Sequence, residues 1–138
     1  MQYANNVHAL KVAITIWKWI AEHPGEYKED AYTVLFPDTD LDLEGDLSSC
    51  SLCQISYDST LKMYSSQHCD RCPAGEEFRQ YEQIDTTYPG TYCLRYATPY
   101  VDWNETLVPD TASIAATAMV ELLQRALARN TGTSTNLP

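Results

Sequence analysis

Two pairs of cysteines in the middle of the chain constrain its fold more than any other feature of the sequence. Cys50 and Cys53 form one C-x-x-C pair, Cys69 and Cys72 form another, and fifteen residues separate the two pairs. This spacing is typical of a structural zinc site, because each two-residue turn aims two sulfurs at one point and two such turns surround the metal with a tetrahedron of thiolates. We therefore expect these four cysteines to bind Zn²⁺ and to hold the middle of the protein together.

Two other residues lie near enough in the sequence to replace one of these ligands. His68 directly precedes Cys69, and Cys93 follows the second pair. Four thiolates already complete a closed site, so we expect Cys93 to be a buried thiol and His68 to lie at the surface or beside the ligands. Replacement of one ligand by either residue stays open. A closed site leaves no coordination position for a reactive water, so the expected role of the metal is structural.

The composition predicts one globular domain over residues 1–129, followed by a flexible tail over 130–138. Hydrophobic residues make up 44% of the 138 residues and charged residues 20%. No apolar run approaches the roughly 18–20 residues of a membrane span, and the first residues lack the basic and apolar regions of a signal peptide. We therefore expect a cytoplasmic protein, in which reduced thiols favour metal binding over disulfides.

Both ends of this domain have the apolar periodicity of helices. Residues 5–22 carry an apolar face wide enough to pack on more than one side or to meet a partner, and the following Pro24-Gly25 ends the pattern. Residues 110–129 predict a second helix, with Asp110 or Thr111 as its N-cap. Its alanines would allow close contact with the first helix.

The segment between these helices has weak periodicity. We expect an acidic loop over residues 26–49, with a possible short strand at 32–36, and then a zinc region over residues 50–103 with a possible small hairpin from Ile55 to Met63. The sequence therefore predicts a small α+β fold, in which two main helices flank an irregular zinc-stabilised region of the zinc-ribbon or knuckle kind.

Negative charge is concentrated in one part of the chain. The formal net charge is −10, and residues 26–46 hold eight acidic side chains and one lysine. Five of these acids occupy every second position in a segment that we call the acidic run: Asp38, Asp40, Asp42, Glu44 and Asp46. The run is interpreted as a solvated loop, a surface that captures a basic partner, or a weak divalent-cation site.

The charge and motif content also limit the function. Binding to a nucleic-acid duplex needs clustered lysine and arginine, and the sequence has no such cluster, so direct nucleic-acid binding is not expected. A basic protein surface is the more natural partner for an acidic chain. The three histidines form no recognisable catalytic motif, and no phosphate-binding glycine loop occurs. We therefore predict that the protein is not an enzyme.

Several short motifs occur in an order that resembles a known group of proteins. The first predicted helix contains Trp17-x-Trp19 and ends at Pro24-Gly25; then come C-x-x-C, C-x-x-C-P, Cys93 and Thr98-Pro-Tyr-x-x-Trp103. This order resembles a group of small, uncharacterised, cysteine-rich phage and prophage proteins, and the resemblance covers about residues 9–128. It implies that the paired cysteines bind a metal within one compact domain, and it implies no activity.

Together these observations favour a non-enzymatic, zinc-stabilised binding module of phage origin, acting in the host cytoplasm. Its partner would be a host or defence protein with a basic surface, which the module would inhibit by covering a surface that normally holds nucleic acid. One alternative is a zinc-ribbon regulator that touches nucleic acid through Lys62, Arg71, Arg79 and Arg95. Another is a metal-dependent hydrolase that uses the acidic run.

Overall fold

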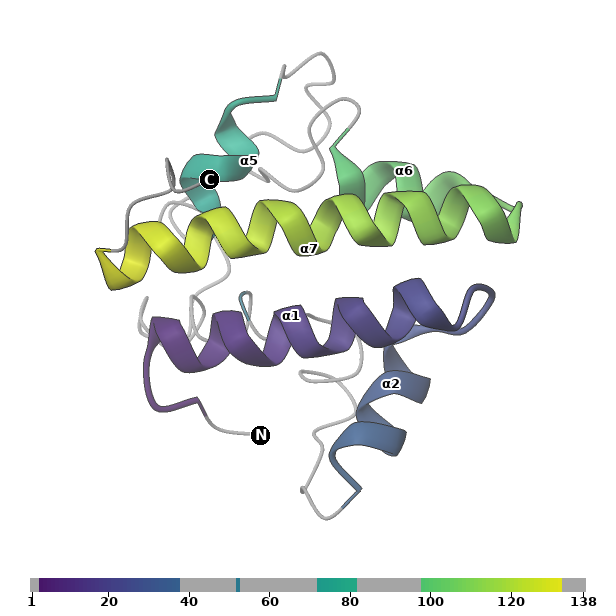
Figure 1. Ribbon diagram of the computed structural model, residues 1–138, viewed down its shortest axis with the longest axis horizontal. Helices are drawn as coiled ribbons and strands as arrows, with labels where there is room; N and C mark the ends of the chain where they lie inside the picture. Colours follow the sequence, from purple (N-terminus) through teal and green to yellow (C-terminus); the bar gives the residue numbers. More distant parts are fainter. Residues whose placement is uncertain (1–2, 38–51, 53–71, 82–97, 133–138) are drawn as a thin grey trace, which may run out of the picture.

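The computed structural model describes residues 3–37, 52, 72–81 and 98–132, and this part of the chain is mostly helical. About three quarters of these residues are in helices and none is in a strand. The small α+β fold class predicted from the sequence is therefore wrong for the described part of the chain. The helices, labelled as in Figure 1, are α1 (Asn6–Glu22), α2 (Lys28–Leu35), α5 (Gly75–Arg79), α6 (Pro99–Glu105) and α7 (Pro109–Thr131).

The two longest helices, α1 and α7, form an antiparallel pair. They lie side by side and run in opposite directions, so the end of α1 is next to the start of α7 (Figure 1). At this end the Ser113 hydroxyl donates a hydrogen bond of 2.7 Å to the carbonyl oxygen of Ala21. Small residues such as Ala116, which is fully buried, allow the close approach. The expected contact between the two predicted helices is confirmed.

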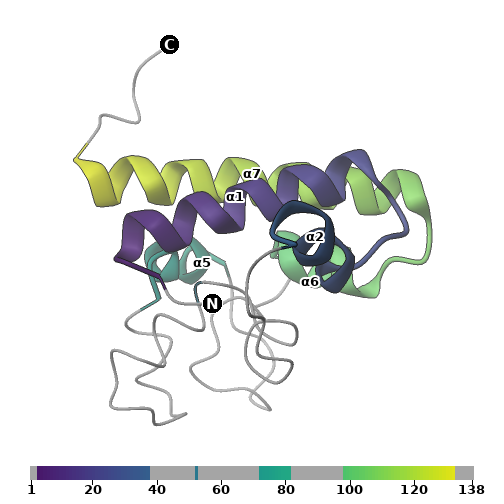
Figure 2. The same ribbon diagram turned by 90° about the horizontal axis from the view of Figure 1, so that it is seen from below.

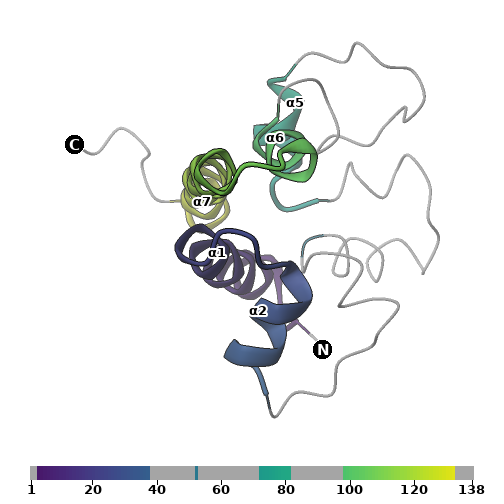
Figure 3. The same ribbon diagram turned by 90° about the vertical axis from the view of Figure 1, so that its right-hand side faces the viewer.

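The shorter helices α2, α5 and α6 all lie on one side of this pair (Figures 2 and 3). The α1 residue Trp17 is buried against α6, with its ring centroid 4.9 Å from that of Trp103 and 6.0 Å from that of Tyr100, both edge to face. Helix α2 adds the buried Tyr32 to the same core. Helix α1 is therefore packed on more than one side, as its wide apolar face predicted.

Specific residues set the ends of the two long helices. Asn5 caps α1, because its side-chain oxygen accepts a 2.9 Å hydrogen bond from the backbone N–H of His8. Helix α7 begins at Pro109, one residue before the predicted start, with Val108 as its N-cap. Proline suits the first helical position because its φ is fixed and it has no N–H to leave unpaired. Asp110 and Thr111 therefore lie in the first turn, and the prediction that one of them caps the helix is wrong.

Helix α2 replaces the expected loop and short strand at residues 28–35. The aromatic and β-branched residues at 32–36 favour a strand locally, but the residues before them favour a helix start. The side chain of Asp30 accepts a 2.9 Å hydrogen bond from the backbone N–H of Tyr27, and Glu29 adds a second acid to the first turn. Lys28, Ala31, Tyr32 and Leu35 then follow helical spacing toward the core.

The predicted zinc region also contributes to the core upstream of α6. Leu52, which precedes Cys53, is 2% exposed and belongs to the same buried cluster as Ala74 and Phe78. The region contains α5 and α6 and is thus less irregular than expected. The possible hairpin from Ile55 to Met63 lies outside the described residues.

The end of α7 lies beyond the predicted helix boundary. The helix continues to Thr131 and stops at Gly132, whose φ of 74° is the left-handed conformation typical of a helix C-terminus. Asn130, predicted to begin a flexible tail, donates a 3.0 Å hydrogen bond from its amide to the carbonyl oxygen of Pro73. Residues 133–138 lie outside the described part of the chain.

No helix in the described part of the chain is both long enough and apolar enough to span a bilayer.

Candidate functional site

The structure describes one of the four predicted zinc ligands. Cys72 is half-buried and packs against the hydrophobic core, whereas Cys50, Cys53 and Cys69 lie outside the described residues, as do His68 and Cys93. No group of three potential metal ligands occurs among the described residues, which include only that one cysteine. Zinc binding by the four cysteines therefore stays a prediction. The acidic run, from Asp38 to Asp46, also lies outside the described residues.

Helix α7 holds the segment that follows Cys72 in place through one arginine. The Arg129 guanidinium donates hydrogen bonds of 2.9 and 2.8 Å to the two carboxylate oxygens of Glu77, and a further bond of 2.8 Å to the carbonyl oxygen of Pro73. The hydrogen bond with Glu77 raises the pKa of Arg129 above its ordinary value, and partial burial opposes this shift. The segment that follows the second C-x-x-C pair is therefore held against the C-terminal end of α7, at the end of the helix pair where α1 begins.

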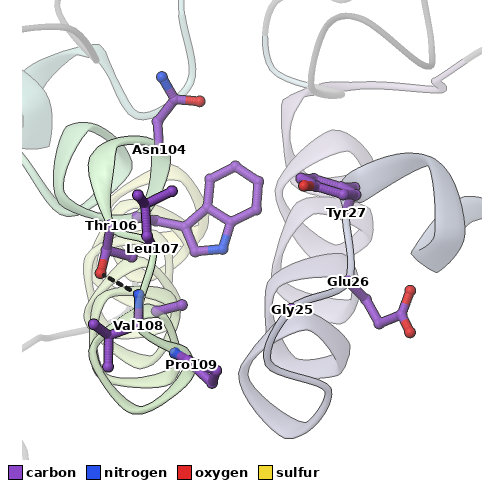
Figure 4. A pocket seen from close by; sticks show the side chains of 10 residues that line it. Gly25, Glu26, Tyr27, Asn104, Thr106, Leu107, Val108 and Pro109 are labelled. Carbon is purple, nitrogen blue, oxygen red and sulfur yellow. Dashed lines mark hydrogen bonds between the residues drawn. The ribbon is translucent and has the colours of Figure 1, made fainter.

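A groove lies at the opposite end of the pair, where two interhelical loops meet. The loop between α1 and α2 forms one wall with Gly25, Glu26 and Tyr27, and the loop between α6 and α7 forms the other (Figure 4). The groove has a volume of about 250 Å³. The second wall consists of Trp103, Asn104, Thr106, Leu107, Val108, Pro109 and Ala112.

The walls of this groove expose apolar side chains that contribute little to the core. Leu107 is 98% exposed, Tyr27 64% and Val108 56%. The conformation of the second loop is set partly by Thr106, whose hydroxyl oxygen accepts a 3.3 Å hydrogen bond from the N–H of Val108 (Figure 4). Exposed apolar side chains that gather around a hollow are typical of interaction sites, whereas single ones are common on any surface. The groove is therefore the candidate functional site among the described residues.

The segments that form the groove are rich in acidic side chains. The segments 22–30 and 102–110, which run through the two loops, contain seven carboxylates and one lysine. That lysine, Lys28, is 8% exposed and its ammonium lies 5.3 Å from the centre of the Tyr100 ring. Two helices end and two begin here, so their dipoles largely offset and the carboxylates dominate the local field.

Sequence reasoning did not find this groove. Its signal is the apolar pair Leu107-Val108 between two predicted elements, directly before a proline. Such a pair is ordinarily assigned to a neighbouring strand or helix, and only the tertiary arrangement shows that it is exposed. The exposed basic residue Arg79, which one alternative assigned to nucleic-acid contact, lies on α5 rather than at the groove.

Comparison of the chain with models of known families, with curated proteins and with solved structures gives no match. The resemblance to phage proteins therefore stays a prediction from the motif order.

Proposed function

We propose that this chain is a non-enzymatic, acidic, zinc-stabilised module that binds a basic surface of a partner protein. The observation that carries the proposal is the charge at the groove end of the helix pair. Segments 22–30 and 102–110 hold seven carboxylates against one lysine. A surface of one sign attracts partners of the other sign and speeds their encounter.

The acidic run extends the same property in the sequence. The acidic run begins just after α2 in the sequence, and the first turn of α2 is itself acidic. Residues 26–46, which include both, carry a net charge of −7. The motif order that resembles phage proteins favours a host or defence protein as the partner. Inhibition would then follow from covering a basic surface that otherwise holds nucleic acid, because the module presents carboxylates where that surface normally meets phosphates.

The experiment is an affinity pull-down from nuclease-treated lysate of the host, with the retained proteins identified by mass spectrometry. One variant replaces the five acids of the acidic run with asparagine or glutamine. A matched control exchanges aspartate and glutamate at the same five positions, which keeps the charge and changes only side-chain length. We expect one protein to be enriched by the unmodified chain and by the control, and to be lost with the neutral variant.

Two results would contradict the proposal. Equal retention by the neutral variant would show that charge in the acidic run does not drive binding. Retention that occurs only when nuclease is left out of the lysate, and that weakens steeply as salt is raised, would favour the zinc-ribbon regulator instead.

A further inference from the structure

We infer that the groove between the two loops is the anchor point of this module, and that it accepts one large apolar side chain from a basic segment of the partner protein. The inference rests on the proposed function, because it names the site and the partner chemistry through which an acidic binding module would act. It adds that residues of the groove, which lie outside the acidic run, select which partner segment is bound.

The size of the groove favours a side chain over a free metabolite. Pockets that bind small molecules have volumes of roughly 300–1,000 Å³ and enclose most of their ligand. The groove has about 250 Å³ and opens between two surface loops. One aromatic or long aliphatic side chain fits this volume, and such anchors dominate the binding energy of many protein interfaces.

The chemistry of the walls also suits an apolar anchor. Trp103 offers part of its ring to the groove while the rest packs on Trp17, so its position is fixed by the core. Leu107 and Tyr27 face the same space from the two loops and are largely exposed. An incoming side chain would therefore cover apolar surface that is now in contact with water, with little rearrangement of the core.

The charge around the groove selects the residues on either side of that anchor. Glu26 lines the groove, and Glu105 and Asp110 lie in the stretch from Trp103 to Ala112 that supplies its second wall; all three are exposed. Lysine or arginine flanking the anchor would meet carboxylates from both loops. A second copy of this chain is a poor occupant, because it would bring an equally acidic end into contact and like charges repel.

The test uses two short fluorescein-labelled peptides and the full chain. Both peptides consist of alternating lysine and serine, and one carries a phenylalanine in place of its central serine. Fluorescence anisotropy gives the Kd of each peptide over ionic strengths from about 0.05 to 0.5 M. We expect both peptides to bind at low salt, and the phenylalanine peptide to bind about tenfold more tightly, because it covers part of an aromatic side chain.

Leu107→Ser and Ile114→Ser form a matched pair of variants for this test. Both residues are exposed, at 98% and 71%, so neither change removes buried core, but only Leu107 lines the groove. We expect Leu107→Ser to reduce the advantage of the phenylalanine peptide by about threefold and Ile114→Ser to leave it unchanged. Thermal unfolding of both variants checks that the fold is retained.

The outcomes separate this inference from the proposed function. Equal affinity for the two peptides, or an equal effect of the two variants, would overturn the anchor while leaving charge-driven binding in place. Absence of binding by both peptides at low salt would overturn both. An advantage for phenylalanine that persists at high salt and in Leu107→Ser would place the apolar contact elsewhere on the protein.

Discussion

The contacts of Arg129 make a quantitative prediction about how α7 supports the segment after Cys72. Replacing Arg129 with methionine keeps the aliphatic stem and removes the guanidinium, which makes two hydrogen bonds to Glu77 and one to the carbonyl oxygen of Pro73. Asn130 also donates to that carbonyl, at 3.0 Å, so the carbonyl keeps one partner. Arg129 Nε also lies 3.3 Å from a carboxylate oxygen of Glu76, so the change tests the pairing with Glu77 together with this more exposed ion pair.

The exposure of the two side chains sets the magnitude. The side chain of Arg129 is 36% exposed and that of Glu77 is 11% exposed, so the pair lies between a solvated ion pair and a buried one. Solvated pairs contribute about 0–1 kcal/mol and hydrogen bonds to charged groups about 1.5–3 kcal/mol. We expect Arg129→Met to lower the free energy of unfolding by about 1.5 kcal/mol, and Arg129→Lys by about 1 kcal/mol because lysine lacks the two-pronged geometry.

Urea unfolding followed by circular dichroism measures these losses, with Arg125→Met as the control. Arg125 lies one turn earlier on α7 and is exposed, so its replacement should change stability by less than about 0.5 kcal/mol. A double-mutant cycle with Glu77→Gln should give a coupling energy of about 1 kcal/mol. A coupling near zero, or equal losses for Arg129→Met and Arg125→Met, would refute the argument.

The pH dependence of this loss follows from the direction of the pKa shift. The pKa of Arg129 is raised in the folded protein, so its contribution is fully present below the unfolded pKa and is lost only as the pH rises through the folded value. Arginine stays protonated throughout ordinary conditions. The difference between the unmodified chain and Arg129→Met should therefore stay constant from about pH 6 to pH 9.

Two further predictions concern the metal and the core. The purified protein should contain zinc by inductively coupled plasma mass spectrometry. Serine in place of any one of the four paired cysteines should reduce the zinc content, whereas Cys93→Ser should leave it unchanged. Equal zinc content in all variants would contradict the ligand assignment. Trp17→Ala should lower the free energy of unfolding, measured by urea unfolding, by about 3–5 kcal/mol, because it opens a cavity beneath Trp103. The control Lys18→Ala, on the exposed side of α1, should change it by less than about 0.5 kcal/mol.

The long helices were predictable because their apolar residues repeat over many turns. Helix α1 ends at Glu22, where Pro24 and Gly25 indicated a stop, and α7 departs from its predicted limits by one residue at the start and two at the end. A period sustained over this length outweighs local composition. The error at the start of α7 came from choosing a polar N-cap where proline already fixes the first helical residue.

Helix α2 was not predictable from composition because its local signals conflict. The strand-favouring residues Thr33 and Val34 face solvent, whereas the buried positions are Lys28, Ala31 and Tyr32. Burial of an aromatic ring in the core and the hydrogen bond at the helix start both stabilise a helix. Neither contribution appears in a count of β-branched residues, because both depend on what surrounds the segment.

The groove depends on tertiary structure in a further way, because its two walls lie about eighty residues apart in the sequence. An antiparallel helix pair places the end of the first helix beside the start of the second, which brings the loop after α1 against the loop before α7. The same arrangement brings the four carboxylates of segment 22–30 and the three of segment 102–110 to one end of the helix pair, which a count of charges along the sequence does not show.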